Sequence, residues 1–219
     1  MNKYEELANE ESLEKTKTSL ERNGFKVFIT DNKKEALNKF LEIVPKNVEI
    51  MNNSSVTLDE VGISKEVMEG NYDSVKKKMA SINQKEMRDK MRKLTTVADY
   101  VVGSAQAVTE NGQILMASNT GSQLPGYAFG ASKVIFVIGI QKIVKDINEA
   151  FKRVEEYILP LESERLKKIY GVPSNISKVL IINKEINPDR ITIIFVKEKI
   201  GFSWSESRKV GKESFKLNL

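Results

Sequence analysis

A run of apolar residues at positions 134–139, Val-Ile-Phe-Val-Ile-Gly, constrains the fold of this chain more than any other feature of the sequence. A strand with no polar face must be covered on both sides, as are the central strands of a parallel sheet flanked by helices. Residues 100–102 and 191–196 have the same apolar character, and segments with helical periodicity lie between these runs. The sequence therefore predicts an α/β fold, a single domain with a mostly parallel central sheet flanked by helices.

Two helix starts are marked by capping-box spacing. Asn32 is followed three residues later by Glu35, directly before an amphipathic pattern. Thr57 and Glu60 have the same spacing and predict a second capping box, which would open a short helix through residue 61.

The other elements follow from periodicity and from turn residues. A helix over residues 5–23 is expected to end at Gly24, because glycine readily adopts the left-handed conformation after a helix. Pro160 is expected to interrupt a long amphipathic helix over 143–158, with a further helix over 161–170. Additional strands are predicted at residues 25–30, 48–51, 114–117 and 179–182.

No linker-like segment divides the 219 residues, so we expect one α/β domain over residues 1–202. A small packed subdomain over residues 1–50 is the alternative for the N-terminal part. Residues 203–219 are basic and lack a clean periodicity, which is typical of a C-terminal tail.

The chain contains no cysteine and no histidine. Disulfides, thiolate metal sites, cysteine nucleophiles, Ser-His-Asp triads and histidine-ligated metals are therefore excluded. We predict no metal site, and the sequence indicates no particular cofactor. The longest apolar runs are much shorter than a bilayer span and the N-terminus is polar, so a cytoplasmic protein without a membrane segment is expected.

Basic residues concentrate between positions 76 and 93, where eight Lys and Arg residues stand against Glu86 and Asp89. Met87, Met91 and Leu94 at helical spacing favour an amphipathic helix with a solvated basic face. A face that binds phosphate or nucleic acid is the alternative. No aromatic residue in the segment could stack on bases, so nucleic acid is not the expected partner.

Ligands of open parallel sheets bind beyond the carboxyl ends of the strands, and three loops meet that criterion. The loop at 52–57 offers hydroxyls as an anion cradle, although Ser and Thr are also the commonest helix caps. The loop at 118–121 could bind an anion through a backbone nest. The predicted ligand-binding residues are Ser54, Ser55, Thr57, Gln106, Asn119, Thr120 and Gly121, with Lys142 at the margin as a cationic partner for an anion.

The third loop, over residues 103–112, contains one carboxylate, that of Glu110. In a chain without histidine or cysteine, Glu110 is the candidate catalytic base or nucleophile. The triplet Glu110-Asn111-Gly112 is also the composition of an ordinary turn, which is the alternative interpretation.

Four segments, taken in order, resemble the LUD (lactate utilisation) domain family: NNSSVTLDEVGI, ADYVVGSAQAVTENGQILMASNTGSQ, KVIFVIGIQKIVKDINEAFKRV and RITIIFVKEKIGF. The resemblance covers roughly residues 10–202 and implies a fold similar to that of coenzyme A transferases and ribose-phosphate isomerases. It implies a protein of lactate or other small-carboxylate utilisation that binds a small anionic or phosphorylated ligand at the sheet edge. Iron–sulfur proteins of lactate utilisation are the partners implied.

The resemblance also bears on single positions. Coenzyme A transferases use the glutamate of a Glu-Asn-Gly turn as nucleophile, which corresponds to Glu110 here. Related isomerases carry an aspartate where this chain has Gln106, and an amide cannot act as acid or base. The segment YGVPSNISKVL lacks the cysteines that relatives carry there, so a cluster-binding role does not carry over. The alternative function is a non-catalytic ligand-sensing or scaffold protein of the same superfamily, and a homo-oligomer is compatible with either.

Overall fold

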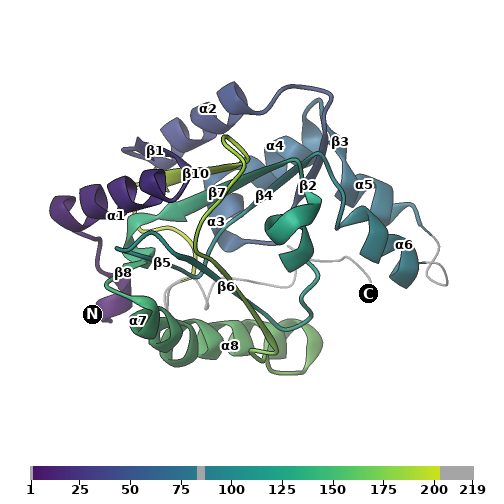
Figure 1. Ribbon diagram of the computed structural model, residues 1–219. Coiled ribbons are helices and arrows are strands. Elements are labelled where there is room, and N and C mark those ends of the chain that lie inside the picture. The colour runs from purple at the N-terminus through teal and green to yellow at the C-terminus, as the bar shows by residue number, and fades with distance from the viewer. Residues whose placement is uncertain (1, 83–86, 203–219) are drawn as a thin grey trace.

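In the computed structural model, which describes residues 2–82 and 87–202, the chain is organised around a six-stranded sheet (Figure 1). In spatial order its strands are β1 (Lys26–Thr30), β10 (Ile191–Val196), β7 (Lys133–Gly139), β4 (Tyr100–Gly103), β2 (Glu49–Asn52) and β3 (Asp73–Ser74). All neighbouring strands are parallel. The three apolar runs form β4, β7 and β10, which are nearly fully buried, so the predicted α/β fold is confirmed.

Helices cover one face of this sheet. They are α2 (Lys33–Ile43), α3 (Val56–Val61) and α4 (Ile63–Glu69). Phe40 and Leu58 from these helices pack in one core with Ile135 and Ile194 of the central strands. Alternate residues of the same strands point to the opposite face, where Phe136 packs in a second core with Leu20 of α1 (Glu10–Arg22).

A second sheet of four strands contributes to that second core. In spatial order its strands are β8 (Ile143–Val144), β5 (Ala107–Thr109), β6 (Ile114–Ser118) and β9 (Lys178–Ile182). β6 is antiparallel to both β5 and β9. The prediction of a loop over 103–112 is wrong in its centre, because Val108 packs in the core shared with the main sheet while Ala107 packs in a separate core on the other side. A three-residue strand buried on both sides has no period that sequence reading can detect.

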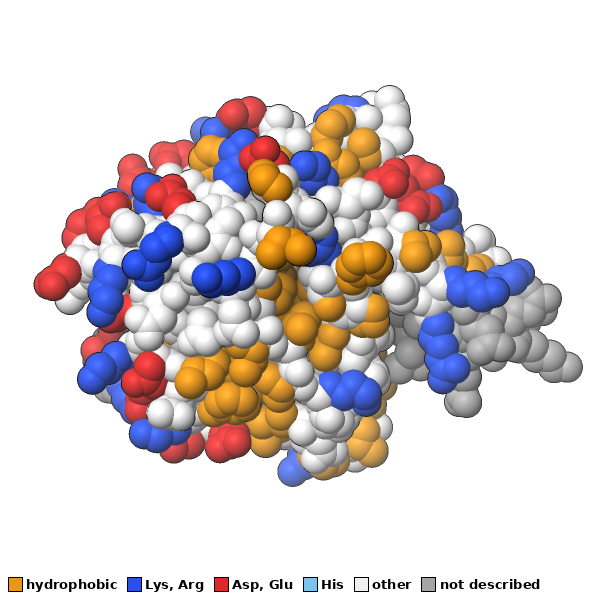
Figure 2. Space-filling view, viewed as in Figure 1, with side chains coloured by type: hydrophobic (Ala, Val, Ile, Leu, Met, Phe, Trp, Pro, Cys, Tyr) orange, Lys and Arg blue, Asp and Glu red, His pale blue; other side chains and the backbone are white. Residues whose placement is uncertain are grey.

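A long helical segment covers the outer face of the small sheet. It consists of α7 (Ile147–Lys152), the π-helical turn η4 (Arg153–Ile158) and α8 (Leu159–Tyr170). The expected interruption at Pro160 is wrong, because the π-helical turn comes just before the proline and the chain stays helical. Figure 2 shows hydrophobic side chains gathered over α7, α8 and the neighbouring edge of the small sheet.

The two predicted capping boxes have different outcomes. The predicted cap at Asn32 is confirmed, because its Oδ1 accepts from the backbone N–H of Glu35 at the start of α2. For α3 the N-cap is Ser55, whose side chain makes no capping bond, so the predicted box of Thr57 and Glu60 is wrong. The first helix begins at Glu10 rather than at residue 5.

Residues 1–50 include β1, which pairs with β10 along its whole length. The basic segment contains two helices, α5 (Val75–Ala80) and α6 (Met87–Leu94). The predicted tail over 203–219 lies outside the described residues. The remaining short elements are η1 (Lys3–Glu5), η2 (Gly126–Gly130) and η3 (Ile140–Lys142).

Candidate functional site

The carboxyl ends of β2, β4 and β7 bring three polar side chains into contact. Lys142, at the end of η3 just after β7, donates to Thr57 Oγ1 at 2.8 Å and to Ser104 Oγ at 2.9 Å. Thr57 belongs to the first turn of α3, and Ser104 follows β4 directly. Two of the sequence-predicted residues, Thr57 and Lys142, therefore meet at the sheet edge.

The Lys142 side chain is buried, with the residue 6% exposed. Among the described residues, no carboxylate forms an ion pair with it. Burial, together with the positive charge of Arg153, lowers the pKa of Lys142 to about 7, and Glu60 opposes the change. The amine is thus held close to its neutral form by desolvation.

A backbone segment after β10 covers this amine. Gly201 has φ +93°, and a Cβ there would lie 2.5 Å from Thr57 Oγ1 and 3.2 Å from Lys142 Nζ. The Gly201 N–H donates to Glu60 Oε2, and the Gln141 side chain donates to the Ile200 carbonyl. Only glycine fits this position, both because of its conformation and because of the close approach.

Arg153 is a second buried cation nearby. Its Nη1 donates to the Gln106 carbonyl at 2.6 Å, and its guanidinium lies 5.9 and 5.3 Å from the ring centroids of Tyr4 and Tyr157. Burial lowers its pKa to about 10. Within the part of the chain that the structure describes, Arg153 has no carboxylate partner and its Nε has no hydrogen bond.

Asn52 adds unpaired polar atoms to this edge. Both its side-chain oxygen and nitrogen are buried without a hydrogen bond to any described residue, and the residue is 1% exposed. Asn52 is the last residue of β2 and stands in register with Val102, two residues before Ser104. Alternation along the strands places Asn52 and Ser104 on the same face of the sheet.

Sequence reasoning missed Ser104, Arg153, Glu60 and Asn52 as site residues. Arg153 could have been found, because it interrupts the apolar stripe formed by Ala150, Val154 and Tyr157 on its helix. A cation inside a buried stripe is unusual unless it is paired. Asn52 and Ser104 stand beside many similar polar residues in the sequence, so no local signal distinguishes them.

A cavity of about 230 Å³ lies between the small sheet and the long helical segment, and Gln106, whose carbonyl accepts from Arg153, is part of its wall. Its walls include Gln106, Asn119 and Thr120 together with Phe202, the residue after Gly201. Gln106 uses both atoms of its amide to pair with the backbone of Ala117, at 3.1 and 3.3 Å, so the amide extends the β5–β6 ladder.

The other predicted residues lie on separate segments of the chain. Ser54 Oγ lies 3.5 Å from the Nζ of Lys76. Gly121 adopts φ +83° and its N–H donates to the Ser118 hydroxyl, which closes the turn after β6. Ser55 serves as the N-cap position of α3.

Glu110 lies elsewhere. Glu110 directly follows β5, at the end of the strand opposite to Gln106, and its carboxylate accepts from Ser12 Oγ and Lys15 Nζ of α1, both at 2.7 Å. Hydrogen bonds from Lys15 and Ser12 lower its pKa. Glu110 thus contacts α1, and it is not among the residues that line the cavity. The predicted turn at 110–112 is present, with Gly112 at φ +79°.

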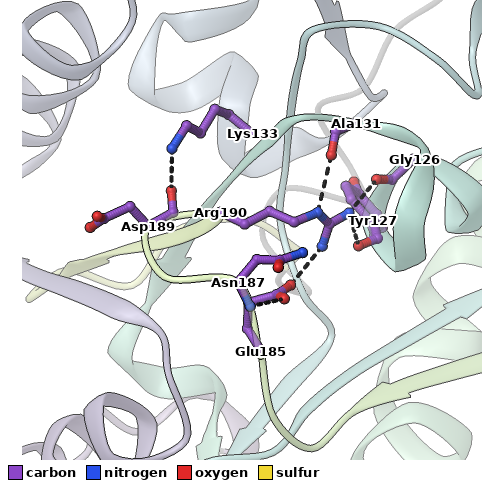
Figure 3. Close-up of polar contacts among 8 residues, drawn as sticks. All are labelled: Gly126, Tyr127, Ala131, Lys133, Glu185, Asn187, Asp189 and Arg190. Atoms are coloured by element: carbon purple, nitrogen blue, oxygen red, sulfur yellow. Dashed lines mark hydrogen bonds and ion pairs between the residues drawn. The ribbon is translucent and has the colours of Figure 1, made fainter.

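A different polar cluster occupies the amino-terminal edge of β7 and β10 (Figure 3). Arg190 donates from Nε to the Ala131 carbonyl, from Nη2 to the carbonyls of Gly126 and Tyr127, and from Nη1 to the Glu185 carboxylate at 2.8 Å. Every nitrogen of this guanidinium has a protein acceptor. The cluster therefore anchors the η2 turn to the sheet and offers no unpaired charge to a ligand.

The described residues contain no group of three carboxylates that could hold a metal ion. No helix in 2–82 or 87–202 is long and apolar enough to cross a membrane.

Comparison with known proteins agrees with this architecture. A family model of the LUD domain matches residues 13–196. No curated protein matches the chain. The crystal structure of a DUF162 family protein from Deinococcus radiodurans, at 1.70 Å resolution, is similar with a TM-score of 0.56 and 11% sequence identity, over 87% of this chain and 99% of that chain. At that identity the likeness shows the fold alone.

Proposed function

This chain belongs to the LUD domain family, named for lactate utilisation, and on that premise we propose that it binds a small carboxylate or phosphorylated ligand at the carboxyl edge of its main sheet. The observation that carries the proposal is the buried Lys142 amine, which contacts two hydroxyls and, among the described residues, has no carboxylate partner. Protonation of such an amine is unfavourable until an anion joins it.

The surroundings of Lys142 support an anionic ligand. Thr57 and Ser104 hold the amine in one position, and Arg153 adds a second positive charge close enough to lower the pKa of Lys142. An anion bound between them would stabilise the protonated form and raise that pKa. Ligand binding and proton uptake by Lys142 are therefore coupled in this proposal.

The backbone at Gly201 lies close to the Lys142 amine and restricts the size of the group that can reach it. We expect one carboxylate or phosphoryl group to reach Lys142, while any larger part of the ligand lies in the neighbouring cavity lined by Asn119 and Thr120. The polar and apolar residues of that cavity suit the uncharged part of such a molecule.

The proposal is tested by thermal unfolding in the presence of lactate, acetate, inorganic phosphate and a sugar phosphate, each up to about 50 mM. A ligand that binds only the folded state raises the melting temperature. We expect at least one of these anions to do so, and Lys142→Met to weaken its binding at least about tenfold, since truncating one partner of a buried charge pair costs 2 kcal/mol or more.

Lys65→Met is the matched control. Lys65 lies on α4 with its side chain 77% exposed, and it pairs with Glu69 on the same helix. The substitution removes the same charge outside the site and should leave binding unchanged. If none of the four anions raises the melting temperature, or if Lys142→Met binds as tightly as the native chain, the proposal fails.

A further inference from the structure

The small sheet ends in a strand with an open edge. β9 pairs with β6, and no other described strand pairs with it. Its sequence, Lys-Val-Leu-Ile-Ile, contains four consecutive apolar residues, and Val179 is 38% exposed. Long apolar edge strands tend to pair with another strand unless charges, prolines or bulges prevent it.

The pairing pattern shows which backbone groups face outward. On β6, Leu115 accepts a bond from the Gln106 N–H, and Ala117 pairs with the Gln106 side chain, so these two residues face β5. Their neighbours in sequence must then face β9, because backbone groups alternate along a strand. These are Ile114, Met116 and Ser118, in register with Ile182, Leu180 and Lys178.

Val179 and Ile181 therefore direct their N–H and C=O groups away from the small sheet. Within the described part of the chain, these four groups have no hydrogen-bond partner. What completes this edge must be an extended backbone, since only a second strand presents donors and acceptors at the matching spacing.

We propose that β9 of a second copy of this chain occupies this edge, in antiparallel orientation about a two-fold axis at Leu180. In that register Val179 of each copy faces Ile181 of the other, and all four outward groups are satisfied on both strands. Lys178 then lies opposite Ile182, so the two lysines do not face each other. The two small sheets join into one continuous sheet.

The strand is self-complementary, which favours a second copy over an unrelated strand. The register that satisfies the backbone also places Val179 opposite Ile181 and Leu180 opposite Leu180. The hydrophobic surface over α7 and α8 borders the same edge and extends the contact (Figure 2). One strand pair buries less than a standard interface, so we expect a reversible dimer with a Kd on the order of 10–100 µM.

Sedimentation velocity of the full chain between about 5 and 500 µM tests the proposal, with Val179→Lys as the disrupting variant. We expect a concentration-dependent dimer in the native chain and a Kd raised at least about tenfold in Val179→Lys. Val97→Lys is the control, because Val97 is 63% exposed and lies between α6 and β4, away from this edge. It should dimerise like the native chain.

Hydrogen exchange of the Val179 and Ile181 amides gives an independent measurement. Their protection should rise with protein concentration, and Val179→Pro, which removes an outward N–H without touching a bond to β6, should abolish the dimer while the chain stays folded. A monomer at all concentrations, or a dimer unaffected by Val179→Lys, overturns the proposal. Protection that does not depend on concentration overturns it too, because residues of the same chain would then cover the edge.

Discussion

Three buried cations among the described residues, Lys142, Arg153 and Arg190, differ in their polar partners. Arg190 pairs with Glu185 and with three carbonyls. Arg153 lies against carbonyls and aromatic rings, and Lys142 donates to hydroxyls. A buried cation that already has a carboxylate has little affinity left for another anion, whereas Lys142 still lacks one. This difference marks Lys142 and Arg153, and not Arg190, as the buried cations that remain for an anionic ligand.

Glu110 is the opposite case, a carboxylate already occupied by partners from the same chain. Its pair with Lys15 is partly exposed, so Glu110→Gln should lower the free energy of unfolding by less than about 1 kcal/mol. The lowered pKa of Glu110 means that this contribution is present above its ordinary pKa and is lost as the pH falls through the folded-state pKa.

Urea denaturation at neutral pH and near pH 3 measures this contribution, and the native chain and Glu110→Gln should converge in acid. Glu164→Gln, which loses an exposed pair with Lys168, is the control. Anion binding should survive Glu110→Gln, because Glu110 contacts α1 and not the cavity. If anion binding is weaker by about tenfold or more in this variant, Glu110 contributes to the binding site after all.

At the scale of elements, side-chain hydrogen bonds to the backbone extend the β5–β6 ladder and hold the η2 turn in place. The Gln106 amide substitutes for a strand residue opposite Ala117. Arg190 binds the carbonyls of Gly126 and Tyr127 in η2 and ties that turn to the start of β10 (Figure 3). The first contact joins the two sides of one hairpin, and the second joins segments more than 60 residues apart.

Arg190→Met should lower the free energy of unfolding by about 3 kcal/mol or more. It removes four hydrogen bonds and leaves the buried Glu185 without its partner. Denaturant unfolding measures the change, and Lys168→Met on α8 should cost less than about 0.5 kcal/mol as an exposed helical pair. An Arg190→Met chain as stable as the native one would show that η2 holds its position without the guanidinium.

At the scale of the whole molecule, two sheets meet so that the Lys142 cluster lies at the edge of the main sheet and a cavity lies between the small sheet and the long helical segment. The small sheet separates the main sheet from α7 and α8 (Figure 1). Desolvation of Lys142 is a product of this packing, because Thr57, Ser104 and Gly201 come from three separate parts of the chain. Folding therefore lowers the pKa of the Lys142 amine.

The lowered pKa of Lys142 should make the stability of the protein depend on pH. Lys142 has a folded-state pKa of about 7 against 10.5 ordinarily, so between these values the unfolded state binds more protons and stability rises with pH. Lys142→Met removes this effect. We expect the variant to be more stable than the native chain at pH 7, with the difference shrinking by up to about 1.4 kcal/mol per pH unit as the pH rises.

Denaturant unfolding of both chains from pH 7 to pH 10 measures the difference, and Lys65→Met provides the matched surface substitution. A Lys142→Met chain less stable than the native one at pH 7 would mean that the amine is paired in the folded state. A saturating anion should flatten the pH dependence of the native chain, since it restores the charge on Lys142.

The central strands, the cap at Asn32 and the turn at Gly112 could be predicted from the sequence, because apolar runs and capping residues act within a few positions of the chain. Long-range packing decided that β5, β6 and β9 form a separate sheet and that Glu110 contacts α1. It also decided that Thr57 binds Lys142, 85 residues away, instead of capping its own helix. Such contacts depend on which distant segments pack together, and the burial that removes water from Lys142 exists only once they have packed.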